Sequence, residues 1–409
     1  MSTMARQAHW SIASRSPMAW PYVPLHELCE KRTGVRDPRL SPDTVFRYVD
    51  ISSIDRLTKT VVDARAIAGR DAPSRARKVI RANDVVVSTT RPNLNAVALI
   101  PSDLHGQIAS TGFCVLRANE RLDPDFLFAY VRSPVFVASL SDLVVGALYP
   151  AVTDRQVMGQ TIPLPPLPEQ KRIAAALREQ LAAAARMRTA AGEQSTIARQ
   201  VLANELAKVF GMPPDEGTRR TTLGHVLSRR QDVVHPHDYP HGDTVFVGLE
   251  HIESDTGHRT GSLEVDMAKL TGRKPRFIKG DIVYGYLRPY LNKVWIAEFD
   301  GLCSVDQYIY EPDSSVIRTE YAAWFMRSSV FLARAPIEQA PGQLPRIRAG
   351  EVADVAIDLP SLRDQDQRVE ALRATSATVK RLSRAIAEQT RATGELPAAL
   401  LRQAFSGGM

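Results

Sequence analysis

The chain repeats itself once, and this repeat is the feature that most limits what it can fold into. "IPLPPLPEQKRIAAAL", which begins at Ile162, and "IDLPSLRDQDQRVEAL", which begins at Ile357, share one layout about 195 residues apart. In both, a proline-containing apolar segment leads into a charged run with glutamine and then into helix-forming residues. Self-similarity at a fixed offset indicates that one structural unit is used twice.

The repeat extends well beyond these two segments. "RANDVVVSTTRPNLNAV", from Arg81, aligns with "IKGDIVYGYLRPYLNKV", from Ile278. "FLFAYVRSPVF" aligns in the same way with "YAAWFMRSSVF", and "LAKVFG" aligns with "LRQAFSG". Each copy therefore consists of a globular part that is followed by a helical part.

The globular part of each copy mixes strands and helices. Short β-branched runs such as "NDVVVST" and "AVALIP" in copy one, and "GDIVYGYL" and "KVWIAEF" in copy two, are bounded by turn residues and predict strands. Asp123 and Pro124 are helix-start signals, and they predict one helix over "DPDFLFAYVRSPVFVASL".

The segment after each proline junction predicts a long helix. Both segments are rich in good helix formers, and their apolar residues recur every three or four positions. In copy one these positions are Ile173, Leu177, Leu181, Ala184, Met187, Ala191, Ala198, Leu202, Leu206 and Val209. In copy two they are Val369, Leu372, Val379, Leu382, Ile386, Leu396 and Leu400. Gly394 and Pro397 are expected to break the second helix near its end.

The two helices are expected to pair with each other. About 40 helical residues span about 60 Å, and a helix with one apolar seam needs a partner. The segments from Pro168 to Phe210 and from Arg363 to Phe405 are equally long, which favours an antiparallel coiled coil. The alternative is that each helix packs on its own globular part. The prolines before the first helix predict a stiff elbow.

The expected fold class is therefore α+β. Two similar mixed α/β domains are joined by two long antiparallel helices in an internal pseudo-two-fold duplication. The expected parts are an N-terminal segment (1–20), a first domain (21–165), a first helix (166–212), a second domain (213–360) and a second helix with a closing motif (361–409).

Charge and cysteine content narrow the class of protein. The formal charge of +7 and the isoelectric point near 9.3 favour an anionic partner, most commonly nucleic acid. The three scattered cysteines, without a CxxC, argue against a disulfide framework or a zinc site. No window approaches the roughly 18 apolar residues of a membrane span, and the N-terminus lacks the apolar core of a signal peptide. We therefore expect a cytoplasmic protein.

The proline junction together with the duplication resembles the specificity subunit of type I restriction–modification systems, and the resemblance covers nearly the whole chain. "PLPPLPEQKRIAAAL" resembles that family's entry into its first conserved helix, and "LLRQAFSG" resembles its closing motif. "RANDVVVSTTRPNLNAV" resembles the hairpin of its target recognition domains. The second junction, "LPSLRDQDQRV", departs from the pattern because it has fewer prolines and is more acidic.

The resemblance implies a function without chemistry in this chain. Two target recognition domains would each read one half of a split site in double-stranded DNA, and the paired helices would set the gap. The helices would also dock two methyltransferase subunits, and motor-nuclease subunits would join the complex. No cofactor is expected in this subunit. S-adenosylmethionine, ATP and magnesium would be bound by the partner subunits.

Basic runs lie just before the matched hairpin in both copies, at residues 70–81 and 269–279, and they predict phosphate contacts. The hairpin turns and a third loop, "GALYPAVTDRQ" or "GQLPRIRAGEV", add further candidates. The candidate DNA-binding residues of copy one are Arg75, Arg77, Lys78, Arg91, Asn93, Asn95, Tyr149 and Arg155. Those of copy two are Arg273, Lys274, Arg276, Arg288, Tyr290, Asn292, Lys293, Arg346 and Arg348.

The candidates differ in what they could contribute. Arginine can bridge guanine and asparagine can bridge adenine in the major groove. The Arg and Asn of the turns, however, are shared by both copies, which favours a structural or phosphate-binding role for them. Asn93 and Tyr290 differ at matched positions and are the better candidates for specificity. The helix positions expected to contact a partner are Glu169, Gln170, Arg172, Ile173, Leu177, Gln365, Arg368, Val369 and Leu372.

Two other classes of function remain as alternatives. A DNA-modifying enzyme is disfavoured because "GMPPDE" and "LPPLPE" lack the residues of a methyltransferase motif, and no GxxxxGK loop for ATP occurs. A coiled-coil scaffold with protein-binding heads is opposed by the basic runs, and salt-dependent binding of duplex DNA would separate the two. "HPHDYPH" could ligate a metal, but copy one has no counterpart, so no metal site is expected.

Overall fold

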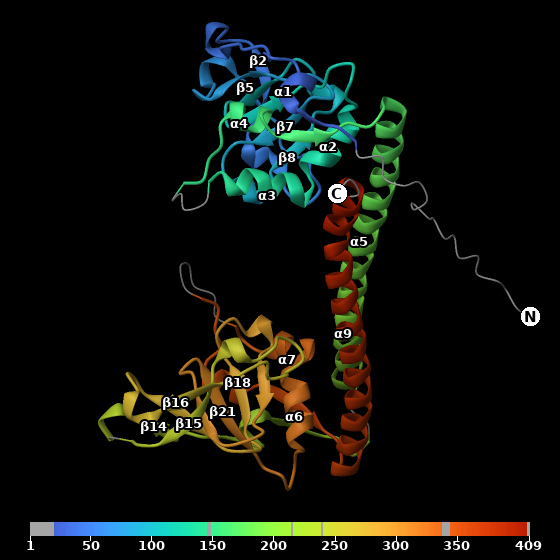
Figure 1. Cartoon of the computed structure of the whole chain (residues 1–409). Coiled ribbons are helices and arrows are strands. Elements are labelled where there is room, and N and C mark those ends of the chain that lie inside the picture. The colour runs from blue at the N-terminus through green and yellow to red at the C-terminus, as the bar shows by residue number, and fades with distance from the viewer. Residues whose placement is uncertain (1–19, 145–148, 214–215, 239, 338–343, 407–409) are drawn as a thin grey trace, which may run out of the picture. The chain divides into compact units, whose positions relative to one another are not determined.

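The computed structural model describes residues 20–144, 149–213, 216–238, 240–337 and 344–406 (Figure 1). The chain divides into two compact units, of which the first comprises Met1–Ala190 and Thr390–Met409 and the second Ala191–Gln389. Each unit holds one globular head, head 1 (20–166) or head 2 (212–361), with a portion of each long helix. The expected N-terminal segment lies almost wholly outside the described residues.

The two long helices are α5 (Leu167–Gly211) and α9 (Leu362–Ser406), and each contains 45 residues. Pro397 lies inside α9, so the predicted break near Gly394 and Pro397 is wrong. A proline inside a helix costs about 3 kcal/mol. The helix continues because Leu401 and Phe405, which follow the proline, are buried in the core of head 1.

Within each unit α5 and α9 pack side by side in opposite directions. In unit 1, Ile173 and Leu177, near the start of α5, share one buried cluster with Phe405, at the end of α9. In unit 2, Phe210, at the end of α5, shares a cluster with Leu372, near the start of α9. The predicted antiparallel pairing is therefore confirmed, although Met187, Leu382 and Leu396 of the predicted seam are exposed.

The described residues of head 1 form a four-stranded sheet, a three-stranded sheet, two two-stranded ribbons and short helices. Its strands are β1 (Tyr22–Pro24), β2 (Val45–Val49), β3 (Ile54–Asp55), β4 (Thr60–Val61), β5 (Arg65–Ala68), β6 (Ala76–Val79), β7 (Val85–Ser88), β8 (Val97–Leu99), β9 (Ile108–Ser110), β10 (Phe113–Leu116) and β11 (Thr161–Pro163). Its α-helices are α1 (Leu25–Leu28), α2 (Pro124–Val131), α3 (Pro134–Asp142) and α4 (Asp154–Met158). Its 3-10 helices are η1 (Pro38–Leu40), η2 (Ile51–Ser53), η3 (Gly69–Asp71), η4 (Pro92–Leu94) and η5 (Ser102–Leu104).

Most elements of head 2 follow the order of head 1. Head 2 adds two strands before its counterpart of β2, and its described residues form no strand pair corresponding to β3 and β4. Its strands are β12 (Arg219–Thr222), β13 (Leu227–Arg229), β14 (Val233–Val234), β15 (Asp243–Val247), β16 (Leu263–Asp266), β17 (Lys274–Phe277), β18 (Ile282–Gly285), β19 (Val294–Ile296), β20 (Gly301–Cys303), β21 (Gln307–Pro312) and β22 (Ala356–Leu359). Its α-helices are α6 (Thr319–Met326), α7 (Ser329–Arg334) and α8 (Ala349–Ala353). Its 3-10 helices are η6 (Leu223–His225), η7 (Pro236–Asp238), η8 (Leu249–His251), η9 (Met267–Lys269) and η10 (Pro289–Leu291).

The sheets of the two heads have matching topology. Head 1 has the orders β5-β2-β9-β6 and β10-β7-β8, and head 2 has β14-β17-β20-β15-β16 and β13-β21-β18-β19. Each larger sheet contains one parallel pair, β2 with β9 or β15 with β20. In each head a two-stranded ribbon, β1 with β11 or β12 with β22, leads into a long helix. The predicted fold class and duplication are thus confirmed.

The single helix predicted over residues 123–140 is two helices. Asp123 caps α2, as expected, by accepting a hydrogen bond from the Phe126 N–H. A second cap follows at Ser133, whose hydroxyl accepts from the Phe136 N–H at the start of α3. In head 2, Ser328 caps α7 in the same way. The serine before the second helix is therefore an N-cap, and a new helix begins after it. The apolar spacing continues across this serine, so the spacing alone predicts one helix.

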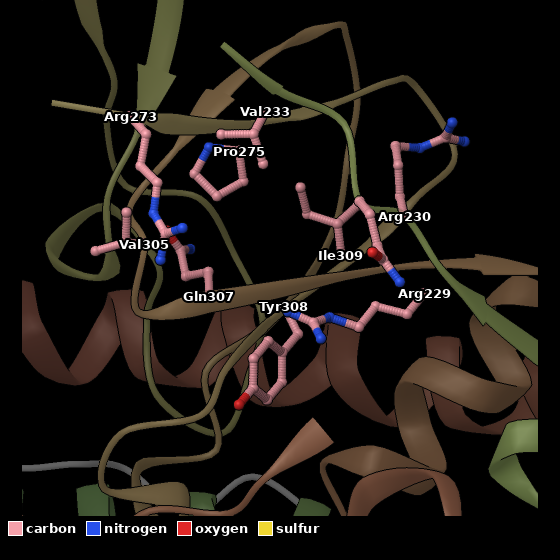
Figure 2. Close-up of a pocket in the computed structure, with 10 residues that line it drawn as sticks. Arg229, Arg230, Val233, Arg273, Pro275, Val305, Gln307, Tyr308 and Ile309 are labelled. Carbon is pink, nitrogen blue, oxygen red and sulfur yellow. The ribbon is translucent and has the colours of Figure 1, made fainter. Parts of the chain in front are cut away.

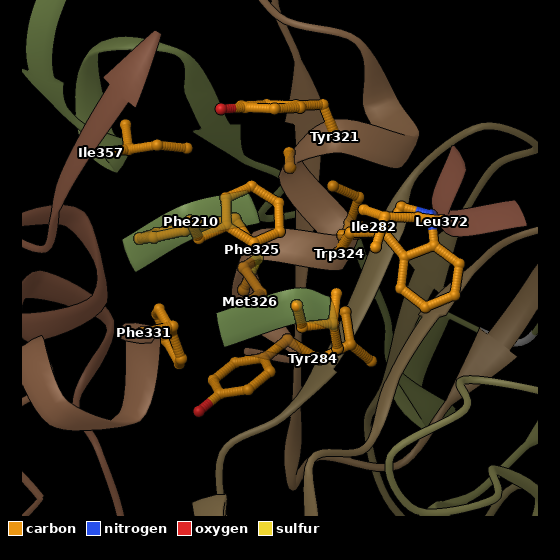
Figure 3. Close-up of a cluster of buried hydrophobic side chains, with 14 of the residues drawn as sticks. Phe210, Ile282, Tyr284, Tyr321, Trp324, Phe325, Met326, Phe331, Ile357 and Leu372 are labelled. Atoms are coloured by element: carbon orange, nitrogen blue, oxygen red, sulfur yellow. The ribbon is translucent and has the colours of Figure 1, made fainter. Parts of the chain in front are cut away.

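The next-to-last residue of each long helix is a phenylalanine that lies in an aromatic cluster. The Phe405 ring lies 5.4 Å from the Phe126 ring and 5.1 Å from the Tyr130 ring, in edge-to-face geometry. Figure 3 shows the matching cluster of unit 2. The centroid of the Phe210 ring lies 5.1 Å from that of the Tyr321 ring and 5.5 Å from that of the Phe325 ring. The end of each helix is thus part of a head's hydrophobic core.

Among the described residues, no helix is long and apolar enough to cross a membrane.

Replacing either terminal phenylalanine should destabilise the unit that holds it. We expect Phe405→Ala to lower the free energy of unfolding of unit 1 by about 3 to 5 kcal/mol, because it removes a buried ring and leaves a cavity. Hydrogen exchange followed by mass spectrometry, read separately for each unit, measures this effect. Leu40→Ala, at an exposed position, is the control. Equal protection in both variants would contradict this packing role.

Candidate nucleic-acid interface

The turns that follow β7 and β18 have the same unusual backbone. Arg91 and Asn95 have φ values of 48° and 46°, and Arg288 and Asn292 have values of 50° and 48°. Asparagine tolerates this left-handed region, whereas a longer side chain such as arginine adopts it only at a cost in free energy. The matched "RPNLN" and "RPYLN" segments therefore encode one strained turn, built twice.

The third loop of each head holds this turn in place. The Arg91 N–H donates to the Pro150 carbonyl at 2.8 Å, and the Arg288 N–H donates to the Pro345 carbonyl at 2.7 Å. Adjacent backbone bridges join Thr90 to Ala151 in head 1 and Leu287 to Arg346 in head 2. Within each head, the structure therefore brings together two of the three segments that the sequence marks as DNA-binding candidates.

A buried aspartate fixes the start of the hairpin in each head. Asp84 is 1% exposed and accepts two hydrogen bonds from Arg117, at 2.8 and 2.7 Å. Asp281 is equally buried and accepts two from Arg230, at 2.8 and 3.1 Å. Arg117 directly follows β10, whereas Arg230 directly follows β13. The aspartate therefore stands at matched positions in the two heads, but its arginine partner does not.

Several candidates are exposed on this framework. They are Arg75, Arg91, Asn93, Tyr149 and Arg155 in head 1, and Arg273, Arg276, Arg288, Tyr290, Arg346 and Arg348 in head 2. Asn93 and Tyr290 stand at matched positions of η4 and η10, and both side chains face solvent. These residues are accessible to a macromolecular partner, and DNA contact by each of them stays a prediction.

Other candidates have partners inside the protein. Lys78 donates to the Phe113 carbonyl at 2.6 Å and pairs with Asp154, and Arg77 lies 3.3 Å from Asp37. In head 2, Lys274 lies over the Phe246 ring and Lys293 donates to the Leu249 carbonyl at 2.5 Å. These four side chains are half-buried. Their contacts favour structural roles over phosphate binding.

The turn asparagines are also used internally. Asn95 Nδ2 donates to the Arg132 carbonyl at 3.3 Å, and Asn292 Nδ2 donates to Asp255 at 2.9 Å. In head 1, Lys59 adds a bond to the Asn95 carbonyl, and burial, helped by the charge of Arg132, lowers the pKa of Lys59 to about 8. Both amides therefore brace the turn, which agrees with the interpretation that shared residues are structural.

In head 2, aromatic side chains that sequence reasoning missed lie among the candidates. Tyr286 stacks on Tyr308 at 4.3 Å, and the Arg229 guanidinium lies 4.7 Å from the Tyr308 ring. Burial, followed by the charge of Asp306, raises the pKa of Tyr286, and the charges of Arg346 and Arg273 oppose that shift. The third loop and the basic run of head 2 thus meet at this tyrosine stack. The sequence could have indicated this stack only through a difference between the copies. Thr89 stands in head 1 where head 2 has Tyr286, and Cys114 stands where head 2 has Tyr308.

Two glutamines that the sequence predicts to contact a partner are instead buried, and they join each long helix to its head by hydrogen bonds. Gln170 accepts from the Asp123 N–H at 2.8 Å and donates to the Arg121 and Pro165 carbonyls, at 3.0 and 2.9 Å. Gln365 accepts from the Arg318 N–H and donates to the Val316 and Pro360 carbonyls, at 2.9, 3.1 and 3.0 Å. Both are at most 1% exposed.

Most other helix candidates also serve the chain's own fold. Ile173, Leu177, Val369 and Leu372 are buried in the two clusters that hold the helices together, so with the glutamines they are reassigned from the predicted partner surface to the core. Arg172 is exposed and pairs with Glu169 at 2.7 Å, and Arg368 is half-buried. Partner binding through these last three residues stays a prediction.

The described part of the chain shows no group of three or more His, Cys, Asp or Glu side chains that could hold a metal ion. The His235 and His237 rings, from the histidine-rich segment, lie 4.8 Å apart. The three cysteines are buried and unpaired.

Comparison with known proteins identifies the family. A family model described as the type I restriction modification DNA specificity domain matches residues 17–185. A solved chain described under complex assembly and conformational transition of the type I R-M system is 32% identical, with a TM-score of 0.82, and the match covers 97% of this chain and 100% of that one. The chain belongs to the type I restriction–modification specificity subunits.

Two further relatives agree with this membership. The HsdS subunit from Thermoanaerobacter tengcongensis is 32% identical with a TM-score of 0.62, and the match covers 97% of this chain and 99% of that subunit. The EcoDI specificity subunit of Escherichia coli is 34% identical over 176 residues, which are 42% of this chain. The chain matches only 38% of the length of this curated E. coli relative.

The buried acid of this specificity subunit gives a direct test of the hairpin framework. We expect Asp84→Ala to lower the free energy of unfolding by about 3 to 5 kcal/mol, because the buried Arg117 guanidinium loses its main carboxylate partner. Thermal unfolding followed by circular dichroism measures the change. Asp103→Ala breaks the exposed ion pair with Arg47 and should cost no more than about 1 kcal/mol. A smaller loss for Asp84→Ala than for the control would contradict the role of the buried pair.

Proposed function

We propose that the chain recognises a bipartite site in double-stranded DNA, with one half-site read by each head and the spacing set by the paired helices. The observation that carries this proposal is the framework that the two heads share. The same turn, third loop and buried aspartate are built twice, and different exposed side chains stand on them. Membership of the specificity-subunit family supports the same conclusion.

The two kinds of residue fit the division of labour at a DNA interface. Arg91 and Arg288 occupy identical positions on an exposed turn, which suits phosphate contacts that fix orientation without reading sequence. Asn93 and Tyr290 stand beside them and differ, which suits contacts to base edges. Since the heads differ at such positions, the two half-sites should differ in sequence.

The proposal assigns the chemistry to partners. Two methyltransferase subunits would dock on the helices, and motor-nuclease subunits would join that complex. S-adenosylmethionine, ATP and magnesium would be held by those subunits, and the present chain would contribute recognition alone. Arg172 and Glu169 are candidates for this docking, because they lie on the accessible side of α5 at the proline junction.

The alternatives are less well supported. A coiled-coil scaffold that binds proteins does not account for an exposed arginine at the same position of the matched turn in both heads. A DNA-modifying enzyme would need a catalytic constellation, and the polar residues at the turns are instead engaged in bracing the backbone. Recognition without catalysis is the function that the geometry supports best.

Methylation mapping tests the proposal directly. The chain is co-expressed with the methyltransferase subunit encoded beside it, and modified bases are mapped across the host DNA. We expect one split motif with two different half-sites and a constant gap, because two different heads are held on one pair of helices. A continuous palindrome, or no modification that depends on this chain, would contradict the proposal.

Shortening the helices tests how the gap is set. Removing seven residues from α5 and the seven that pack against them from α9 shortens the pair by about 10 Å, which corresponds to about three base pairs. Methylation should disappear from the original sites, and any new sites should have a shorter gap. A variant in which seven residues of each helix are replaced without deletion is the control. An unchanged gap in the shortened variant would show that the helices do not set the spacing.

A further inference from the structure

Head 2 contains a polar cavity of about 230 Å³ (Figure 2). Its lining comes from β13, β14, β17, the start of β21 and residues next to these strands. It includes Arg229, Arg230, Arg273, Gln307 and Tyr308. The charged side chains in this lining are all arginines. The cavity therefore presents hydrogen-bond donors and positive charge to whatever occupies it.

Gln307 supplies a buried donor that has no partner. Its side chain is 2% exposed, and Oε1 accepts a hydrogen bond from the Ser304 N–H at 2.9 Å. The other end of the amide, Nε2, is buried without a hydrogen-bond partner among the described residues. A buried donor left unpaired costs free energy, so this atom points to an acceptor that the protein itself does not provide.

Two of the three arginines are not neutralised. Arg230 pairs with Asp281 at 2.8 Å and with Glu311 at 3.2 Å. Within the described part of the chain, no ion pair is formed by Arg229 or Arg273, and Arg229 instead lies over the Tyr308 ring. The nearby acid Asp306 is hydrogen-bonded to Ser304. The missing acceptor should therefore carry negative charge.

The geometry favours a phosphate over a base. Tyr286 and Arg229 both stack within 5 Å of the Tyr308 ring centroid, which leaves little of that ring open to a base. In duplex DNA the base edges lie at the floor of the grooves, whereas the phosphates protrude and can enter a cavity. We infer that this cavity of head 2 binds a backbone phosphate of DNA through Arg229, Arg273 and Gln307 Nε2. The inference rests on the proposed function.

Head 1 does not repeat this site. Gln307 pairs with Gly285 across the sheet, and in head 1 the matched pair is Phe113 with Ser88. Phe113 and the following Cys114 are both buried and apolar. The cavity is therefore an anchor belonging to head 2, added to the framework that both heads share.

The test uses the whole complex of this chain with its methyltransferase subunit and a duplex that carries the mapped site. Arg273→Ala should weaken binding about tenfold, because one phosphate contact is lost. For the same reason the plot of log affinity against log salt should become less steep, with a slope smaller in magnitude by about one. Gln307→Leu should weaken binding about fivefold. Arg220→Ala, which removes an exposed arginine of β12 outside the cavity, is the charge-matched control. Circular dichroism checks that each variant is folded.

Replacing single phosphates identifies the contact. A neutral methylphosphonate at one position in the half-site of head 2 should weaken the wild-type complex about tenfold and the Arg273→Ala complex hardly at all. Unchanged affinity and salt slope in Arg273→Ala and Gln307→Leu would overturn the inference. So would a relaxed preference at one base pair, since the cavity would then read a base. A wild-type complex that fails to bind the duplex would overturn the proposed function itself.

Discussion

The fold depends on aromatic packing at the far end of each long helix. Phe210 and Phe405 are the last large apolar residues of α5 and α9, and each enters a cluster with aromatic side chains of a head. A helix of 45 residues with one apolar seam gains little stability from helix propensity alone, because most helical stability in proteins comes from tertiary packing. Each helix is held at its start by a buried glutamine, Gln170 in α5 and Gln365 in α9, and at its end by the phenylalanine. These two attachments fix the register of the helices. Antiparallel pairing then follows within each unit.

The heads likewise depend on a few contacts that hold the backbone in the same way in both copies. Each matched turn has two residues at positive φ, and a carbonyl of the third loop accepts a hydrogen bond from the N–H of the first of them. Asn83 and Gly280 show how little of the sequence needs to be shared: both lie at positive φ before the buried aspartate, and both donate to the opposite strand, at 2.9 and 2.8 Å. The backbone geometry is therefore the same in both heads even where the residues differ, and the residues that face solvent are free to differ. A pair of readers with different preferences can therefore be built on one scaffold.

Sequence reasoning reached the fold because duplication gives every pattern a second example. The matched proline junctions and the three-four spacing predicted two heads and antiparallel helices. It failed where a distant contact outweighs a local signal. Pro397 and Gly394 predict a break, yet α9 continues because Leu401 and Phe405 are buried beyond them. The sequence predicts Gln170 on a partner surface because nothing local shows that its amide is held by Asp123, Arg121 and Pro165. The tyrosine stack of head 2 depends on residues that meet only after β18 and β21 have paired.

How arginine is used separates structure from recognition in this chain. Arg117 and Arg230 each grip a buried carboxylate in bidentate geometry, and such a pair neutralises its own charge. Arg229 and Arg273 have no neutralising acid among the described residues. Arg229 is oriented by the Tyr308 ring, and Arg273 directly precedes β17. An arginine that is positioned but not neutralised keeps its attraction for an anion, and its orientation has already been fixed before binding. Basic residues that the fold has already neutralised are therefore poor candidates for DNA contact, however prominent they are in the sequence.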